Sequence, residues 1–321
     1  MHYFRNLIKS NLGFMLSKIP VVRKSIEGSL TVFAFHDVSN NPSEFSKEFG
    51  LCVSPDTFKL QCQWIKLNFN VVHPADFING MALPRNAAML SFDDGFLGSF
   101  ENGLEILEQL ELPSISFLNM GSIINKTPMI SAMACYLVRF NKSFPEYAKK
   151  NGLKSPIHLS LYPSALSKFQ EEYGLIDFNL VTKYQGLLAD INIVKKWDKS
   201  PLVCYGNHLF EHWNAIALNK KEFQEQYNKN EIILRNFKSY VHLFAFTNGQ
   251  PNSCFNNETI INLKELGVGN VFSCFNGVNR NYKDKFLLGR ISLGPNDNSS
   301  NRLWFSLTRA LMQNKNSTLI K

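Results

Sequence analysis

Short apolar runs alternate with amphipathic segments along most of the chain. The apolar runs are nearly continuous, which is the pattern of strands covered on both faces of a parallel sheet. Amphipathic helices lie between several of them, so the order predicts an α/β fold with a parallel sheet, open or closed into a barrel. We predict six strands, over residues 30–35, 88–92, 114–118, 202–205, 241–246 and 271–274.

Terminal residues mark two of the intervening helices. Ser54 followed by Pro55 is typical of a helix N-terminus, because serine caps the first turn and proline fits its first position. A later helix is expected to begin at Asn257 and to end at Gly267.

The regular spacing of strands breaks between Leu118 and Leu202. Amphipathic pieces lie in this interval, and a connection of this length in a compact domain has its own structure or a function. We therefore predict a helical insertion over 122–198. It divides one domain, residues 26–321, which follows an N-terminal segment of residues 1–25.

The N-terminal segment carries much of the positive charge. The chain of 321 residues has a formal net charge of +8, and residues 1–24 contain five basic and no acidic residues. Apolar residues recur there at helical spacing, and Pro20 should end or kink the helix. Two interpretations remain open: a helix lying on an anionic membrane surface, or a basic helix packed on the domain.

Composition excludes several classes of protein. Hydrophobic residues make up 45% of the chain and charged residues 19%, which is ordinary globular usage. The charge outside the N-terminal segment is too weak for a nucleic-acid-binding face. There is no apolar run of transmembrane length and no secretory signal. The six cysteines form no metal or redox motif and are expected to be free thiols, so we expect a cytoplasmic location.

Two adjacent carboxylates, Asp93 and Asp94, follow the predicted strand 88–92. The carboxyl ends of parallel strands form the ligand-binding side of such folds. Two neighbouring carboxylates are costly there unless a cation compensates them. The alternative is a helix cap and turn, in which Asp and Gly are common.

His208 and His212 follow another predicted strand. A spacing of four would place both on one side of a helical turn, where they suit one metal ion. One aspartate and these two histidines would leave a coordination position open for water or substrate. With Glu211, the same segment also fits the H-x-x-E-H pattern of zinc peptidases, but that interpretation leaves the aspartate pair unexplained.

The segment Ser91-Phe-Asp-Asp-Gly95 resembles the T-F-D-D-G motif of polysaccharide deacetylases of the NodB-homology type, and the two histidines resemble that family's second motif. The segment 33–38, with His36, is similar to its N-terminal Y-H-D-V stretch. The resemblance covers roughly 30–118 and 200–292. It implies a distorted (β/α) barrel and metal-dependent removal of an acetyl group from a sugar.

The resemblance also implies roles for individual residues. Asp94, His208 and His212 would hold a divalent metal, for which zinc is the expected ion. Asp93 would be the base that takes a proton from the attacking water. The segment 244–249 resembles the third motif, so a backbone N–H near Asn248 and Gly249 is the expected oxyanion donor.

Three departures from the family pattern change this assignment. Thr247 and Asn248 replace the proline–aromatic pair of the third motif. No arginine opens that motif, and Arg290, in a stretch similar to the family's L-P-R-I, is the candidate to tether the base instead. The late histidine that supplies the general acid is absent, so we assign that role to His36, with a structural histidine as the alternative.

The sequence therefore predicts a hydrolase that removes an acetyl group, most simply an N-acetyl group, from a sugar of a glycan or glycan precursor. Trp213 either stacks on the sugar or packs in the core. The alternative function is a non-catalytic paralogue that binds a glycan or a protein partner. Residues 1–24 would provide any contact with the inner membrane face.

Overall fold

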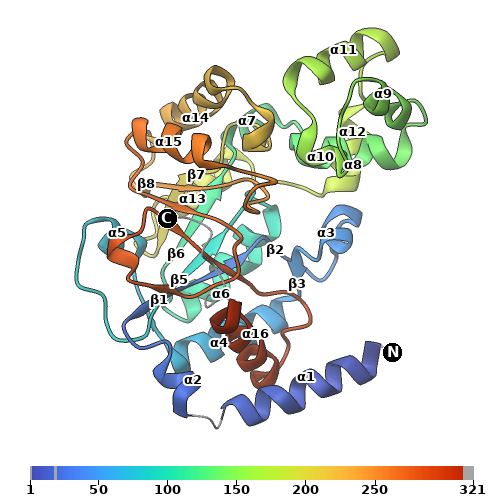
Figure 1. The fold of residues 1–321 in the computed structure, drawn as a ribbon. Coiled ribbons are helices and arrows are strands. Elements are labelled where there is room, and N and C mark those ends of the chain that lie inside the picture. The colour runs from blue at the N-terminus through green and yellow to red at the C-terminus, as the bar shows by residue number, and fades with distance from the viewer. Residues whose placement is uncertain (1, 18–19, 314–321) are drawn as a thin grey trace.

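The computed structural model describes residues 2–17 and 20–313, and its centre is a curved parallel sheet (Figure 1). Neighbouring strands follow the order β1, β5, β6, β7, β8, β9 and β11. The six predicted strands are all present, with ends shifted by up to two residues. Their bounds are β1 Ser29–Phe35, β5 Ala87–Phe92, β6 Ser114–Leu118, β7 Val203–Asn207, β8 Tyr240–Ala245 and β9 Asn270–Phe272.

The last strands nearly close this sheet into a barrel. β11 (Leu287–Leu288) pairs with β9 at one edge, and β12 (Ile291–Ser292) pairs with β1 at the other. Only Gly289 and Arg290 separate these two strands, so the chain crosses from one edge to the other within two residues. β10 (Asn279–Arg280) adds an antiparallel pairing to β1, and β4 (Asn70–Val71) pairs with β5. The predicted barrel is confirmed.

Alternate residues of each strand enter different parts of the core. In β1, Leu30 and Val32 belong to an apolar cluster inside the barrel, whereas Phe33 and Phe35 pack against the surrounding helices. All seven residues of β1 are buried. This double coverage explains why the strands are continuous apolar runs in the sequence.

The outer layer contains helices that the sequence marks clearly. α4 (Pro55–Asn68) begins after Ser54, whose hydroxyl accepts a hydrogen bond from Thr57 N at 3.2 Å. α15 (Asn257–Glu265) begins as predicted and is followed by Gly267 with φ of 73°. The remaining outer helices are α2 Pro20–Lys24, α3 Glu44–Phe49, α5 Pro74–Ile78, α6 Leu104–Gln109, α14 Lys220–Leu234 and α16 Ser300–Gln313.

All the helices and strands assigned between β6 and β7 are helices joined by loops, as predicted for the insertion, and α8–α12 project to one side of the barrel (Figure 1). Ser43 Oγ, just before α3, donates to Gln185 O at 2.6 Å, and Glu48 of α3 pairs with Arg139 at 2.8 Å. The insertion is therefore anchored to the barrel domain. Its helices are α7 Met120–Asn125, α8 Ile130–Phe140, α9 Phe144–Lys150, α10 Ile157–Ser160, α11 Pro163–Tyr173, α12 Phe178–Gln185 and α13 Ile191–Trp197.

The N-terminal helix α1 (His2–Ser17) lies along α16 (Figure 1). The two backbones meet at Gly13, where a Cβ atom would overlap the carbonyl of Asn301. α1 ends three residues before Pro20, which begins α2. A further face of α1, with Ile8, Leu12 and Met15, is exposed to solvent. None of the described helices combines the length and apolar character needed to cross a membrane.

Candidate metal centre

The aspartate pair lies in a tight turn directly after β5. Asp93 N donates to Phe35 O at 3.0 Å, which continues the pairing of β1 and β5 by one residue. Asp94 and Gly95 then have φ of 72° and 80°, and Gly95 N donates back to Asp93 O at 2.9 Å. Because the backbone turns between them, the two carboxylates have different partners.

The histidine segment is a loop, not the helical turn that the spacing predicted. Residues 208–212 have no regular secondary structure, and Leu209 and His212 have φ of 61° and 62°. These left-handed conformations fold the loop back on itself. The two imidazoles consequently meet with ring centroids 5.0 Å apart, although no helix holds them.

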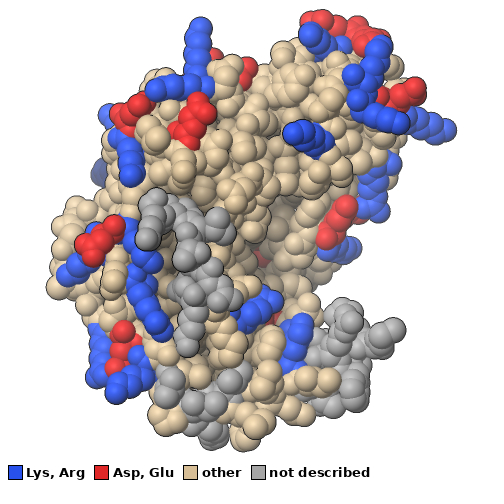
Figure 2. Space-filling model, viewed as in Figure 1, with Lys and Arg blue, Asp and Glu red and all other residues tan. Residues whose placement is uncertain are grey.

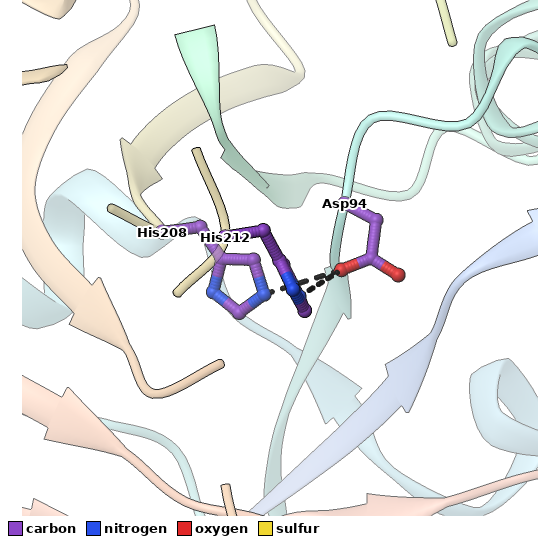
Figure 3. Close-up of side chains that lie close together, drawn as sticks. All are labelled: Asp94, His208 and His212. Carbon is purple, nitrogen blue, oxygen red and sulfur yellow. Dashed lines mark ion pairs between the residues drawn. The ribbon is translucent and has the colours of Figure 1, made fainter. Parts of the chain in front are cut away.

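Asp94, His208 and His212 converge on one point (Figure 3). The Oδ1 atom of Asp94 lies 3.3 Å from His208 Nε2 and 3.0 Å from His212 Nε2. All three residues are buried, and their candidate ligand atoms lie within 4.8 Å of one another. One carboxylate and two imidazoles suit a divalent transition metal and leave a coordination position open. The residues present therefore fit the metal that the sequence implies.

The other ring nitrogen of each histidine has its own partner. His208 Nδ1 lies 2.8 Å from Ala245 O, which can only accept, so this nitrogen carries a proton and Nε2 is the atom that would bind a metal. His212 Nδ1 lies 2.8 Å from Ser131 Oγ of α8. Such partners orient metal-binding histidines and set their tautomer. Ser131 could not be predicted from the sequence, since a lone serine in a distant helix carries no recognisable signal.

Asp93 faces the point of barrel closure, where Arg290 lies between β11 and β12. Arg290 donates to both carboxylate oxygens of Asp93, at 2.6 and 2.7 Å, and its side chain is fully buried. Burial raises the pKa of Asp93, but the charges of Arg290, His208 and His36 outweigh burial and hold that pKa below its usual range. Asp93 is therefore ionised at neutral pH, and the arginine found beside it is the one proposed from sequence.

His36 follows β1 and also lies near Asp93. Its Nε2 atom is 3.9 Å from Asp93 Oδ2, and 18% of its side chain is exposed. It lines the same cavity as the Asp94–His208–His212 cluster. This placement suits a group that exchanges a proton with a bound ligand. His242 of β8 instead contacts Glu231 at 2.9 Å and is not among the cavity residues.

Asn248 and Gly249 occupy the turn after β8, with φ of 58° and 67°. The N–H of Gly249 donates to Thr247 O at 2.6 Å within this turn, so that group is already engaged. Asn248 lines the cavity, and its Nδ2 atom is buried with no partner among the described residues. Of the two predicted oxyanion residues, only Asn248 is therefore placed to meet a ligand.

The metal-site residues, His36 and Asn248 line a cavity of about 370 Å³. The apolar part of its lining includes Phe45 and Phe49 of α3 and Leu293 beyond β12. The insertion adds Ser131, Cys135 and His158. No Lys or Arg is among the described residues that line the cavity. In Figure 2, basic and acidic side chains are dispersed over the face drawn and form no continuous basic patch.

Trp213 and Glu211 lie outside this cavity. The Trp213 ring is only 4% exposed and packs in an apolar cluster, and its Nε1 donates to Glu211 Oε2 at 3.2 Å. Gln226 Nε2 donates to the same oxygen at 2.8 Å. Trp213 is thus a core residue rather than a surface for a sugar. The peptidase interpretation also loses its basis, because Glu211 does not face the cluster and the segment is not helical.

Similarity to solved structures supports the fold. No family profile matches the sequence, and no curated protein matches it significantly. The Streptococcus pyogenes deacetylase PplD, solved with acetate, is 12% identical, with a TM-score of 0.59 over 87% of this chain and 98% of its own. IcaB from Ammonifex degensii is 16% identical, with a TM-score of 0.57 over 87% and 97%.

A third similar structure is a de-N-acetylase from Aggregatibacter actinomycetemcomitans. It is 19% identical, with a TM-score of 0.55 over 86% of this chain and 99% of its own. The fold is therefore that of the polysaccharide deacetylases, as the motifs predicted. The alignments span nearly the full length of these proteins.

Proposed function

We propose that this protein is a metal-dependent hydrolase that removes an acetyl group, most simply an N-acetyl group, from a sugar. The observation that carries the proposal is that one cavity is lined by Asp94, His208, His212, Asp93 and His36. A metal-ligand set, an ionised carboxylate and a histidine are the groups that amide hydrolysis requires. The names of two similar structures, a deacetylase and a de-N-acetylase, support the same reaction.

Each group has one task in this reaction. A divalent metal bound by Asp94, His208 and His212 would polarise the acetamide carbonyl and lower the pKa of water. Asp93 takes the proton from the attacking water while Arg290 keeps the carboxylate oriented. The side-chain amide of Asn248, whose Nδ2 atom has no partner among the described residues, stabilises the developing oxyanion. His36 donates a proton to the leaving nitrogen as the C–N bond breaks, and the products are acetate and a free amine.

The residues that line the cavity favour an uncharged sugar as the part of the substrate that binds there. This lining lacks Lys and Arg among the described residues, so a phosphate group would find no cationic partner inside apart from the proposed metal and His36. Phe49 is 42% exposed in the apolar part of the lining and offers a surface for the apolar face of a sugar ring. In a lipid-linked or nucleotide-linked substrate, the phosphates would therefore lie outside the cavity.

Acetate release tests the proposal directly. Purified protein is incubated with a panel of N-acetylated sugars and oligosaccharides, with and without chelator, beside Asp93→Asn. We expect chelator-sensitive release that falls at least about a hundredfold in the variant, since it removes the base. Zinc content and a thermal melt show that the variant is folded and loaded. Zinc-loaded wild type that binds oligosaccharide without releasing acetate would instead favour the non-catalytic glycan-binding paralogue.

We propose further that α1 brings the enzyme to an anionic membrane surface, with the cytoplasmic face as the expected location. Gly13 of α1 packs on α16, while Ile8, Leu12 and Met15 on another face are exposed. The basic residues of the segment complement anionic lipid. Binding to vesicles containing phosphatidylserine, lost in Ile8→Ser with Leu12→Ser, would support this. Equal binding by that variant would contradict it.

A further inference from the structure

The two metal-site histidines are held by different parts of the molecule. The barrel holds His208, whose Nδ1 donates to Ala245 O at the end of β8. The helical insertion holds His212, whose Nδ1 lies 2.8 Å from Ser131 Oγ in the first turn of α8. Ser131 is 3% exposed and His212 is 5% exposed, so water does not compete for this contact.

The insertion also holds the backbone of the histidine loop. Gly121 N of α7 donates to Phe210 O at 2.8 Å, and Ile130 N of α8 donates to Glu211 O at 3.1 Å. A Cβ atom on Gly121 would lie 2.5 Å from the Phe210 carbonyl oxygen, so glycine permits this close approach. Three consecutive residues of the loop, 210–212, therefore rest on the start of the insertion.

We propose that Ser131 is a positioning residue for His212, so that the helical insertion completes the metal centre of the barrel. With the hydroxyl as acceptor for Nδ1–H, His212 would keep the lone pair of Nε2 for a metal held beside Asp94 Oδ1. Without this partner the imidazole can rotate, and a buried N–H loses its hydrogen bond. The inference rests on the proposed metal site but not on the reaction that the site performs.

The role predicts a loss of metal affinity. Removal of a partner to a metal-binding histidine weakens binding on the order of 10- to 100-fold. We expect such a rise in the zinc dissociation constant for Ser131→Ala, measured by competition with a chromophoric chelator on the full chain. Ser160→Ala is the matched control, because its hydroxyl donates to Lys154 O within the insertion and lies outside the cavity. It should bind zinc as the wild type does.

A second pair of variants separates the hydroxyl from packing. Threonine and valine have nearly the same shape, so Ser131→Thr and Ser131→Val differ mainly in the group that accepts the hydrogen bond. We expect Ser131→Thr to bind zinc at least tenfold more tightly than Ser131→Val. A merely structural role would affect both variants equally.

The outcomes separate this inference from the proposed function. Equal zinc affinities of Ser131→Thr and Ser131→Val, together with wild-type affinity of Ser131→Ala, would overturn the positioning role and leave the deacetylase proposal intact. Weakened zinc binding in Ser131→Ala would support the positioning role. If the zinc-loaded wild type at the same time releases no acetate from any substrate, that result would count against the proposed reaction. Melting of the metal-free variants checks that each is folded.

Discussion

Arg290 donates hydrogen bonds to both carboxylate oxygens of Asp93 across the gap where the barrel closes. The arginine lies between the strands that pair with the two edges of the sheet, and the aspartate follows β5. The contact therefore joins barrel closure to the candidate base. Both side chains are buried, so each charge depends on the other for compensation.

Replacement of Arg290 should cost stability as well as activity. We expect Arg290→Gln to lower the free energy of unfolding by about 3–5 kcal/mol, because it leaves the Asp93 charge buried and unpaired. Urea unfolding of the two proteins at pH 7 measures this. A double variant that adds Asp93→Asn should recover part of the loss. If Arg290→Gln unfolds at the same urea concentration as wild type, the pair contributes nothing to stability.

Zinc should stabilise the folded protein only when the three ligands are intact. At a free zinc concentration about 100 times the dissociation constant, the expected gain is about 2.7 kcal/mol. A thermal melt should therefore shift upward with zinc in wild type and remain unchanged in His208→Ala. His73→Ala is the control, because His73 does not line the cavity. A zinc-dependent shift that persists in His208→Ala would place the metal elsewhere.

His36 should affect turnover without affecting the metal. We expect His36→Gln to lower kcat by about 10²- to 10⁴-fold, the usual contribution of a general acid. Its zinc affinity should match wild type, since the side chain is not among the candidate metal ligands. Steady-state acetate release and zinc titration of the same preparation measure the two quantities. Unchanged kcat would favour the alternative, a structural histidine at a strand end.

The lowered pKa of Glu231 in α14 predicts that the protein loses stability at low pH. Burial raises its pKa, but His242, Tyr240 and Arg235 outweigh burial and lower the pKa to about 2. A carboxyl with a lowered folded pKa stabilises the fold above its unfolded pKa of about 4.5, and that stability is lost as pH falls toward 2.

Glu231→Gln should accordingly be less stable than wild type at pH 7, on the order of 1–2 kcal/mol after allowance for solvent screening. The difference should shrink between about pH 4.5 and pH 2. Urea unfolding across that pH range tests this. A stability difference independent of pH would show that packing, and not ionisation, explains it.

Local signals predicted much of the architecture. The strand that precedes Asp93 is buried on both faces, and such strands leave a continuous apolar run that can be read without the fold. Ser54 and Gly267 marked helix ends through local hydrogen bonding and backbone conformation. The same signals could not predict the conformation of the loop that carries His208 and His212. Its left-handed backbone conformation depends on contacts with parts of the chain that are distant in sequence.

The sequence by itself determined which residues are chemically competent: an aspartate pair after one strand, a histidine pair after another and an arginine near the end of the domain. Tertiary structure alone decided what each residue contacts. Arg290 reaches Asp93 only because the barrel closes, and Ser131 meets His212 only because the insertion packs on the histidine loop. Motifs depend on neighbours in the chain, whereas a buried hydrogen bond between residues far apart in sequence exists only after the chain has folded.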